Sequence, residues 1–151
     1  SWINKITVGG NTYQYPAKYK ISAFNADVSE YEIVFRLAEL YLIRAEARAQ
    51  QGKTNEAKDD LNAIRARAGL SGTTANDKNS LLTAITHERR VELFTEWGHR
   101  WFDLKRTGSV DAIMSIVTPI KGGTWNTNSK LFPVPLTDLR INPNLTQNTG
   151  Y

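Results

Sequence analysis

The sequence predicts a mainly α-helical protein, and three features of the 151-residue chain support this interpretation. From residue 33 onward, apolar residues recur at a spacing that places them on one face of a helix. Gly52 and Gly69 interrupt this period at points where helices commonly end. The beginning and the end of the chain carry instead the prolines, paired glycines and asparagines that are typical of extended or irregular structure.

We expect residues 1–151 to form a single domain with three consecutive segments. Residues 1–29 contain Gly9-Gly10 and alternating runs of polar and aromatic residues, which indicate a hairpin or an extended coil. Residues 30–118 should be helical. Residues 119–151 should form a long irregular segment whose apolar side chains pack back onto the helices, because a segment with that apolar content is unlike a disordered tail.

The first two helices should span residues 33–51 and 54–68 and form a hairpin of the tetratricopeptide type. The small residues Ala45 and Ala57 lie where two closely packed helices need small side chains, and Thr54 could cap the second helix. The apolar positions expected to face the core are Ile33, Leu37, Leu40, Tyr41 and Ala47 in the first helix, and Ala57, Leu61, Ile64 and Ala68 in the second.

A helix, a break and a second helix should follow this hairpin. Ser80 is a candidate cap for a helix that runs to about Glu96. Gly98 should interrupt it, because glycine disfavours a helix interior by about 1 kcal/mol. We expect a short helix around residues 101–106 and one or two further turns in residues 110–116.

The third helix carries carboxylates where a core face should be. At 100° per residue, Leu81, Ile85, Glu88, Glu92 and Glu96 fall within roughly 80° of one another. Buried carboxylates need cationic partners, because an unpaired buried charge is very costly.

Two arginines are the expected partners of these carboxylates. By the same arithmetic Arg44 lies about 20° from Ile33 on the apolar face of the first helix. It should reach one of Glu88, Glu92 or Glu96, and Arg100 should pair with another. We call the set Arg44, Glu88, Glu92, Glu96 and Arg100 the charged seam, and we interpret it as structural.

Residue patterns for catalysis and metal binding are weak. Glu96-Trp97-Gly98-His99 matches half of a di-iron motif, but Gly98 breaks the helical register that such a site requires. The chain has no cysteine and two histidines. A carboxylate pair for glycoside hydrolysis could be drawn from Glu88, Glu92, Glu96 and Asp103, yet structural ion pairing is far commoner. We therefore predict no catalytic residue, no metal site and no cofactor.

Composition limits the partners of the chain. The formal charge is +4, but 23% of residues are charged and both signs are interspersed, which disfavours nucleic acid as a partner. No run approaches the ~18 apolar residues of a membrane span. The sequence alone therefore predicts no membrane-spanning segment.

Among the aromatic residues, Trp125 is the best local candidate for stacking against a sugar ring. It lies in a loop rich in glycine, threonine and asparagine, although a tryptophan packed onto the fold is the commoner situation. Trp97 and Trp101 are expected in the core, and the partners of Trp2 and Tyr19 are not evident. One stacked ring contributes only about 1 kcal/mol beyond area burial, so glycan binding by this chain alone should be weak or absent.

Three motifs resemble the SusD/RagB family of bacterial surface glycan-binding lipoproteins. The first is the run of residues 88–106, which reads ERRVELFTEWGHRWFDLKR. The second is RLAELYLIRAEA at residues 36–47, similar to the first helix of the C-terminal part of the family. The third is LFPVP at residues 131–135 together with the closing QNTGY. Family members are much longer, so the chain resembles a C-terminal fragment of one.

The resemblance implies a non-enzymatic protein on the external face of the outer membrane, held by a lipid anchor upstream. It would capture oligosaccharides or polysaccharides and deliver them to a SusC-like TonB-dependent transporter. The family's glycan-binding residues come mostly from other parts of its members, so none is carried over here. From the residues alone, a tetratricopeptide-like protein–protein interaction module with no glycan binding of its own fits the hairpin equally well. A hydrolase is a third and weaker interpretation.

Overall fold

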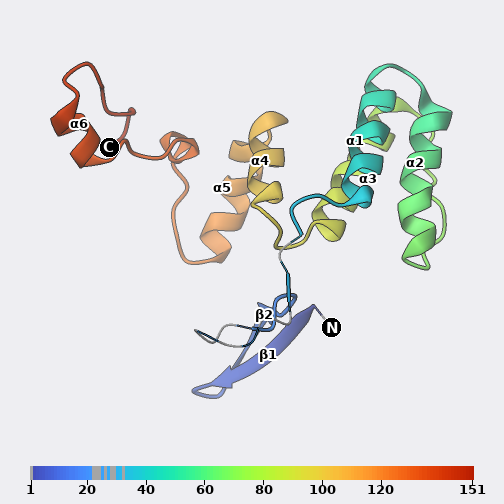
Figure 1. The fold of residues 1–151 in the computed structure, drawn as a ribbon, viewed down its shortest axis with the longest axis horizontal. Helices are drawn as coiled ribbons and strands as arrows, with labels where there is room; N and C mark the ends of the chain where they lie inside the picture. The colour runs from blue at the N-terminus through green and yellow to red at the C-terminus, as the bar shows by residue number, and fades with distance from the viewer. Residues whose placement is uncertain (1, 22–24, 26, 28–29, 32) are drawn as a thin grey trace. The chain divides into compact units, whose positions relative to one another are not determined.

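The structure is a computed structural model, and it describes residues 2–21, 25, 27, 30, 31 and 33–151. These residues form six α-helices, one short 3₁₀ helix and a two-stranded sheet, which confirms the mainly α-helical class (Figure 1). The chain separates into two compact units, Ser1–His99 and Arg100–Tyr151. The assignment of residues 1–151 to one domain stays a prediction.

The first unit begins with a β-hairpin. β1 (Ile3–Val8) and β2 (Asn11–Pro16) pair antiparallel, with Ile3 opposite Pro16 and Val8 opposite Asn11. Gly9 and Gly10 join the strands with φ of 58° and 82°. Two positive φ values in a two-residue loop define the turn that best matches the twist of the strands, and glycine adopts them without strain. The hairpin interpretation of this segment is therefore confirmed.

Three helices lie side by side in the rest of the first unit: α1 (Leu37–Gln50), α2 (Thr54–Arg67) and α3 (Lys78–Glu92) (Figure 1). α1 and α2 end alike, with Gly52 and Gly69 at φ of 77° and 72°. The residue after each glycine donates its backbone N–H to a carbonyl in the last turn of the helix: Lys53 to Arg48 and Leu70 to Arg65, both at 2.9 Å. This glycine ending satisfies carbonyls that the helix leaves unpaired. The predicted helical hairpin is confirmed.

The core of the first unit lies between α1, α2 and α3. Its largest fully buried side chains are Leu42, Leu61, Leu81 and Ile85. Ala45 and Ala57 are also fully buried in this core, as expected for two helices in close contact.

The prediction of which face of α1 is buried is wrong. Leu37 and Leu40 are 70% and 56% exposed, whereas Ala38, Leu42 and Ala49 are 4% exposed or less. The physical reason is the size of the side chains. A face that is mostly alanine lets the backbone of a neighbouring helix approach closely, and close approach fills the core at high density. On α2, Ala57, Leu61 and Ile64 are buried as predicted, but Ala68 is exposed.

Helix ends differ from the prediction by a few residues. α1 begins at Leu37 rather than residue 33, and the N-cap of α2 is Lys53 rather than Thr54. The Asp77 side chain caps α3 by accepting from the backbone N–H groups of Asn79 and Ser80. The Ser80 hydroxyl in turn accepts from the backbone N–H of Asp77. This reciprocal arrangement satisfies the backbone N–H of Asp77 as well as N–H groups of the first turn, which a serine cap alone does not.

The break after α3 begins earlier than predicted, because the helix ends at Glu92 rather than near Glu96. Thr95, Trp97 and Gly98 have positive φ values of 59°, 41° and 71°. Three such residues in four positions turn the chain sharply, so Glu96 lies in the turn and not on the helix. The predicted interruption at Gly98 is confirmed, although Gly98 is only its last residue.

The second unit contains most of α4 (His99–Arg106), then α5 (Val110–Ile120), the 3₁₀ helix η1 (Thr127–Lys130) and α6 (Leu136–Ile141). α5 extends four residues beyond the predicted Ile116. The region predicted to be irregular thus contains two short helical elements. Its apolar side chains were expected to pack back onto the helices, and this is wrong for Phe132, Leu136 and Ile141, which are 77%, 66% and 82% exposed.

Side-chain hydrogen bonds to the backbone connect the two parts of the C-terminal motif. The Gln147 side chain accepts from the Val134 N–H at 2.7 Å and donates to the Val134 carbonyl at 3.0 Å. Asn148 donates to the Phe132 carbonyl at 2.6 Å, and the Tyr151 hydroxyl donates to the Leu131 carbonyl at 2.8 Å. The closing residues therefore bind the backbone of residues 131–134.

Candidate functional site

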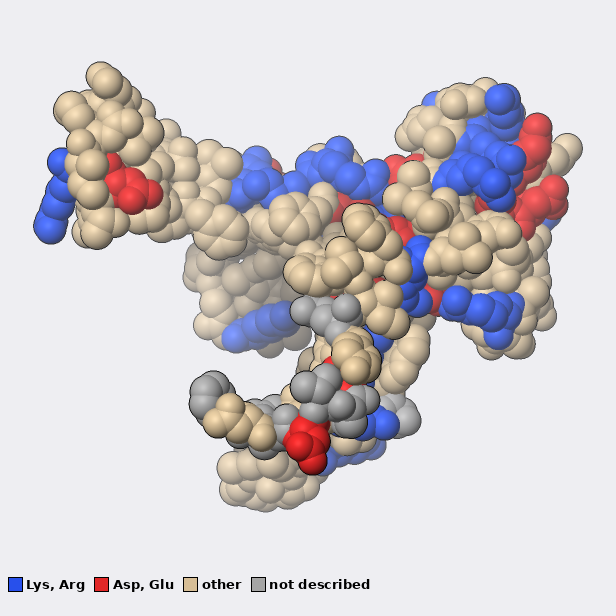
Figure 2. All heavy atoms as spheres, in the orientation of Figure 1, with Lys and Arg blue, Asp and Glu red and all other residues tan. Residues whose placement is uncertain are grey.

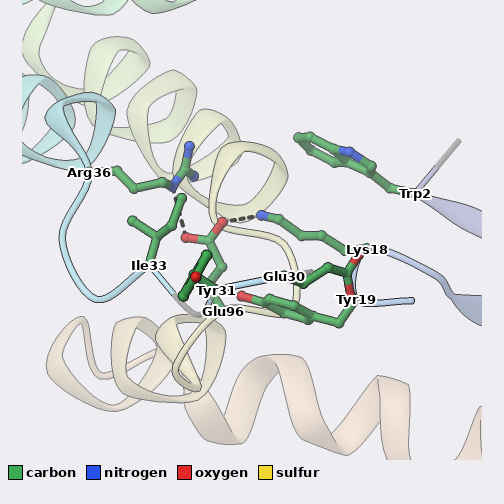
Figure 3. A pocket seen from close by; sticks show the side chains of 8 residues that line it. All are labelled: Trp2, Lys18, Tyr19, Glu30, Tyr31, Ile33, Arg36 and Glu96. Carbon is green, nitrogen blue, oxygen red and sulfur yellow. Dashed lines mark hydrogen bonds and ion pairs between the residues drawn. The ribbon is translucent and has the colours of Figure 1, made fainter. Parts of the chain in front are cut away.

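A pocket of about 310 Å³ opens in the first unit, beside the turn that follows α3 (Figure 3). Its walls come from three places in the sequence: the ends of the β-hairpin, the segment before α1, and the turn after α3. Half of its lining side chains are aromatic or aliphatic, namely Trp2, Tyr19, Tyr31 and Ile33. The other half are charged, namely Lys18, Glu30, Arg36 and Glu96.

Glu96 is the anchor of the charged half. It is 6% exposed, and its two carboxylate oxygens take different cations. Oε1 forms an ion pair with the Lys18 ammonium, and Oε2 accepts from Arg36 Nε at 3.0 Å (Figure 3). The Lys18 ammonium also lies 4.7 Å from the centre of the Trp2 ring, in a cation–π contact. Glu96 therefore joins the hairpin segment to the segment before α1.

Glu30 supplies the second carboxylate of the pocket. Its Oε2 accepts from the backbone N–H groups of Lys20 and Ile21, at 2.7 and 3.0 Å. These two hydrogen bonds hold the pKa of the Glu30 carboxyl below its ordinary value, so it is ionised at neutral pH. Two cations and two carboxylates thus line the pocket, and their formal charges cancel.

The predicted burial of the seam carboxylates is confirmed. Glu88, Glu92 and Glu96 are 4%, 6% and 6% exposed. Glu88 accepts from Arg65 Nη1 at 2.9 Å. Glu92 accepts from Arg36 Nη1 and from Arg67 Nη2, both at 2.6 Å.

Burial of Glu92 acts to raise the pKa of its carboxyl, but the hydrogen bonds from Arg67 and Arg36 outweigh burial and lower that pKa. Glu92 is therefore a buried anion that two guanidinium groups stabilise.

The predicted partner of Arg44 is wrong. Arg44 binds Asp60 of α2 through Nε at 2.9 Å and Nη2 at 2.7 Å, and Arg48 binds the same carboxylate at 2.6 Å. Arg44 therefore pairs with α2, and its side chain is 54% exposed. On the face shown in Figure 2, basic and acidic side chains of the helical hairpin lie beside one another. The pairing of Arg100 with a seam carboxylate stays a prediction.

The ion pairs of the seam carboxylates do not favour a role in acid–base catalysis. A glycosidase needs one carboxylic acid that is protonated near neutral pH. Glu88, Glu92 and Glu96 each contact at least one cation instead, and for Glu92 these contacts lower the pKa of the carboxyl. Within the part of the chain that the structure describes, no group of three or more His, Cys, Asp or Glu residues is placed to hold a metal ion.

Trp125 is fixed in its loop. Its indole Nε1 donates to Asp111 Oδ1 at 2.9 Å, and its ring meets Trp101 edge to face at 6.3 Å. Asp111 also accepts from Thr127 at 2.8 Å and from Lys130 at 2.6 Å. These three donors, with Lys130 the strongest, lower the pKa of Asp111 to about 2. The role of Trp125 in glycan binding stays a prediction.

The other tryptophans also differ from expectation. Trp97 is 49% exposed and donates its indole N–H to the Ile33 carbonyl at 3.2 Å, so its predicted place in the core is wrong. Trp101 is half-buried. Sequence reasoning did not identify Trp2, Tyr19 and Tyr31 as a set. Their signal was the concentration of tryptophan and tyrosine in the first 31 residues, but which of them share a pocket depends on tertiary contacts.

Comparison with known proteins identifies the family. A family model described as the SusD family matches residues 3–151. SusD-like protein P38 of Formosa agariphila is 39% identical over 128 residues, which cover 79% of this chain and 24% of that protein. The starch-binding protein SusD of Bacteroides thetaiotaomicron is 34% identical over 130 residues, which cover 78% of this chain and 21% of that protein.

Solved structures agree. A SusD-like protein from Bacteroides fragilis has a TM-score of 0.64 and 32% identity, over 79% of this chain and 26% of that one. A SusD superfamily protein from Bacteroides vulgatus has a TM-score of 0.68 and 27% identity, over 99% of this chain and 35% of that one. The protein therefore belongs to the SusD/RagB family. It spans between 21% and 29% of the length of the relatives it matches in sequence.

Proposed function

We propose that this chain is part of a non-enzymatic protein that captures glycans at the bacterial cell surface. It would deliver them to a SusC-like TonB-dependent transporter in the outer membrane. Membership of the SusD/RagB family and the name of one relative, a starch-binding protein, support this role. The structural observation that carries it is the pocket, which three aromatic side chains line together with two cations and two carboxylates.

The pocket has the chemistry that sugar recognition needs. A pyranose ring presents C–H groups on its faces, which pack against aromatic rings, and hydroxyl groups on its rim, which donate and accept hydrogen bonds. Trp2 and Tyr19 are 48% and 44% exposed, so ring surface is available to a ligand. Glu30 and Lys18 supply an acceptor and a donor beside these rings.

The proposed location is the external face of the outer membrane. No helix among the described residues is long and apolar enough to cross a bilayer. The proposal includes attachment by a lipid anchor outside the residues described here, as the family resemblance implies.

Affinity electrophoresis tests the proposed capture directly. The chain is run through native gels that contain starch, xylan, mannan or pectin, with serum albumin as a non-binding reference. Slight retardation by at least one glycan is expected, because the chain alone should bind glycans weakly. Unchanged migration in all four gels would contradict glycan capture by this chain. Co-purification from outer-membrane extracts then tests the transporter as a partner.

One observation favours the alternative of a protein–protein interaction module. Phe35, Leu37, Leu40 and Ile43 are between 49% and 81% exposed and lie in or just before α1. Exposed apolar residues that lie close together commonly mark an interface. A Leu37→Ser, Leu40→Ser variant separates the two roles: it should lose a protein partner if α1 is an interface, while retardation by glycans persists if the pocket is the glycan site.

A further inference from the structure

We infer that the pocket between Trp2, Tyr19 and Glu96 binds an uncharged pyranose unit of an oligosaccharide, and that it discriminates against acidic sugars. This inference rests on the proposed glycan capture and adds the site and the sugar class. The sequence had pointed to Trp125 instead, in the other unit of the chain.

The charges of the pocket argue for an uncharged ligand. Lys18 and Arg36 both contact the Glu96 carboxylate, and Arg36 also binds Glu92. A uronic acid would have to compete with these buried carboxylates for the two cations. It would also lie near Glu30, which is held in its ionised form. Like charges at short range disfavour binding, whereas sugar hydroxyls incur no such repulsion.

The rings argue for a sugar rather than another neutral molecule. Lys18 covers one face of the Trp2 indole at 4.7 Å, yet the residue remains 48% exposed. Tyr19 and Tyr31 add two phenol rings with hydroxyl groups at their tips, and Tyr31 is 79% exposed. Aromatic faces that alternate with hydrogen-bonding groups match the alternating apolar and polar surface of a pyranose.

The size of the pocket limits how much of a glycan it holds. Its 310 Å³ lies at the lower end of the ~300–1,000 Å³ that is typical of small-molecule sites. One or two sugar rings fit, and the rest of an oligosaccharide chain would extend into solvent. Binding at this site alone should therefore be weak, and the measurement must detect millimolar dissociation constants.

Nuclear magnetic resonance of the ¹⁵N-labelled chain can detect binding with millimolar dissociation constants. The protein has four tryptophans, so four indole N–H signals separate the pocket at Trp2 and the turn at Trp97 from the loop where Trp125 meets Trp101. Each signal is assigned from a single Trp→Phe variant. The probes are maltohexaose, xylohexaose and mannohexaose as neutral ligands, and hexagalacturonate as the acidic one. We expect a neutral hexasaccharide to shift the Trp2 signal while Trp125 stays unchanged, and hexagalacturonate to bind at least about fivefold more weakly.

Matched variants test the residues. Tyr19→Ala should weaken neutral binding at least about fivefold, because it removes one aromatic platform. Tyr13→Ala is the control, since Tyr13 is a similarly exposed tyrosine on the hairpin that does not line the pocket. It should leave binding unchanged.

The other outcomes separate the two proposals. Binding that shifts only Trp125, or that favours hexagalacturonate, would overturn this inference and leave glycan capture standing. Equal effects of Tyr19→Ala and Tyr13→Ala would also overturn it. No shift with any of the four hexasaccharides would contradict both the site and glycan capture by this chain.

Discussion

Arg36 and Glu92 are joined by two hydrogen bonds of 2.6 Å each. Arg36 Nη1 donates to the Glu92 carboxylate, and Nη2 donates to the Glu92 backbone carbonyl. Arg36 directly precedes α1 and Glu92 ends α3, so the contact ties together two helix ends that are far apart in the sequence. The same guanidinium reaches Glu96 in the pocket. The ion pairs of the helical core and the walls of the pocket are therefore one connected network.

Replacing Glu92 by Gln should destabilise the chain by about 2 kcal/mol. The variant removes the charge that stabilises Arg36 and Arg67, and Arg36 then remains partly buried without its main counter-charge. Urea unfolding followed by circular dichroism measures the free energy of unfolding. Asp59→Asn, an exposed position on α2, is the control and should change it by less than about 0.5 kcal/mol.

The cost of Glu92→Gln should also depend on pH. The pKa of Glu92 is lower in the folded chain than in the unfolded one. Its contribution is then fully present above the unfolded pKa of 4.5 and is lost as the pH falls through the folded value. The difference in the free energy of unfolding between the parent chain and the Glu92→Gln variant should therefore become smaller in acid. A gap that is the same at pH 7 and at pH 3 would reject this role for Glu92.

Leu42→Ala and Leu40→Ala form a matched pair on α1. Leu42 is fully buried and Leu40 is 56% exposed. Truncation of Leu42 should cost about 3 kcal/mol, because it opens a cavity between α1, α2 and α3. Truncation of Leu40 should cost less than about 0.5 kcal/mol. Equal costs in urea unfolding would mean that the core face of α1 is assigned incorrectly.

The sequence predicted the helices better than it predicted their faces. Gly52 and Gly69 placed the ends of α1 and α2 to within one or two residues. Both have a positive φ, which few residues other than glycine adopt at a helix end. The buried face of α1 was misassigned because large apolar residues were assumed to be core. Ala38, Leu42, Ala45 and Ala49 recur at helical spacing, so the correct face was visible in the sequence as a row of small residues.

The site was predictable only in part. Glu88 and Glu92 continue the apolar face of Leu81 and Ile85, and helical geometry alone predicted their burial. Their partners could not be read in the same way. Arg65 and Arg67 lie in the last turn of α2 and Arg36 just before α1, and which of them reaches α3 depends on how the helices pack. The aromatic lining of the pocket depends on tertiary contacts for the same reason.

Asp111 should keep its hydrogen bonds to Trp125, Thr127 and Lys130 down to unusually low pH. Its folded pKa is about 2, against 3.8 when unperturbed. The stability it adds is present above pH 3.8 and is lost as the pH falls through about 2. In an NMR titration, the Trp125 indole N–H should keep its shift down to about pH 3 and move below that. An Asp111→Asn variant should show no such midpoint, and a midpoint near 4 in the parent chain would contradict the assignment.

Gln147 should protect the amide of Val134 from hydrogen exchange. Its side chain both accepts from and donates to the Val134 backbone, as a neighbouring strand would. Gln147→Ala removes both bonds, so exchange at Val134 should accelerate at least about fivefold if each bond contributes about 1 kcal/mol. Thr137→Ala, in the same unit but exposed, is the control. Unchanged exchange at Val134 would show that the closing residues do not hold this segment.

A crystal of the chain soaked in the neutral hexasaccharide that it binds most tightly is the most direct measurement. We expect electron density for one or two pyranose rings against Tyr19 and Trp2, with hydroxyl groups within hydrogen-bond distance of Glu30 or Lys18. Density that packs against Trp125 instead, or a pocket that holds no sugar at saturating ligand, would contradict this expectation.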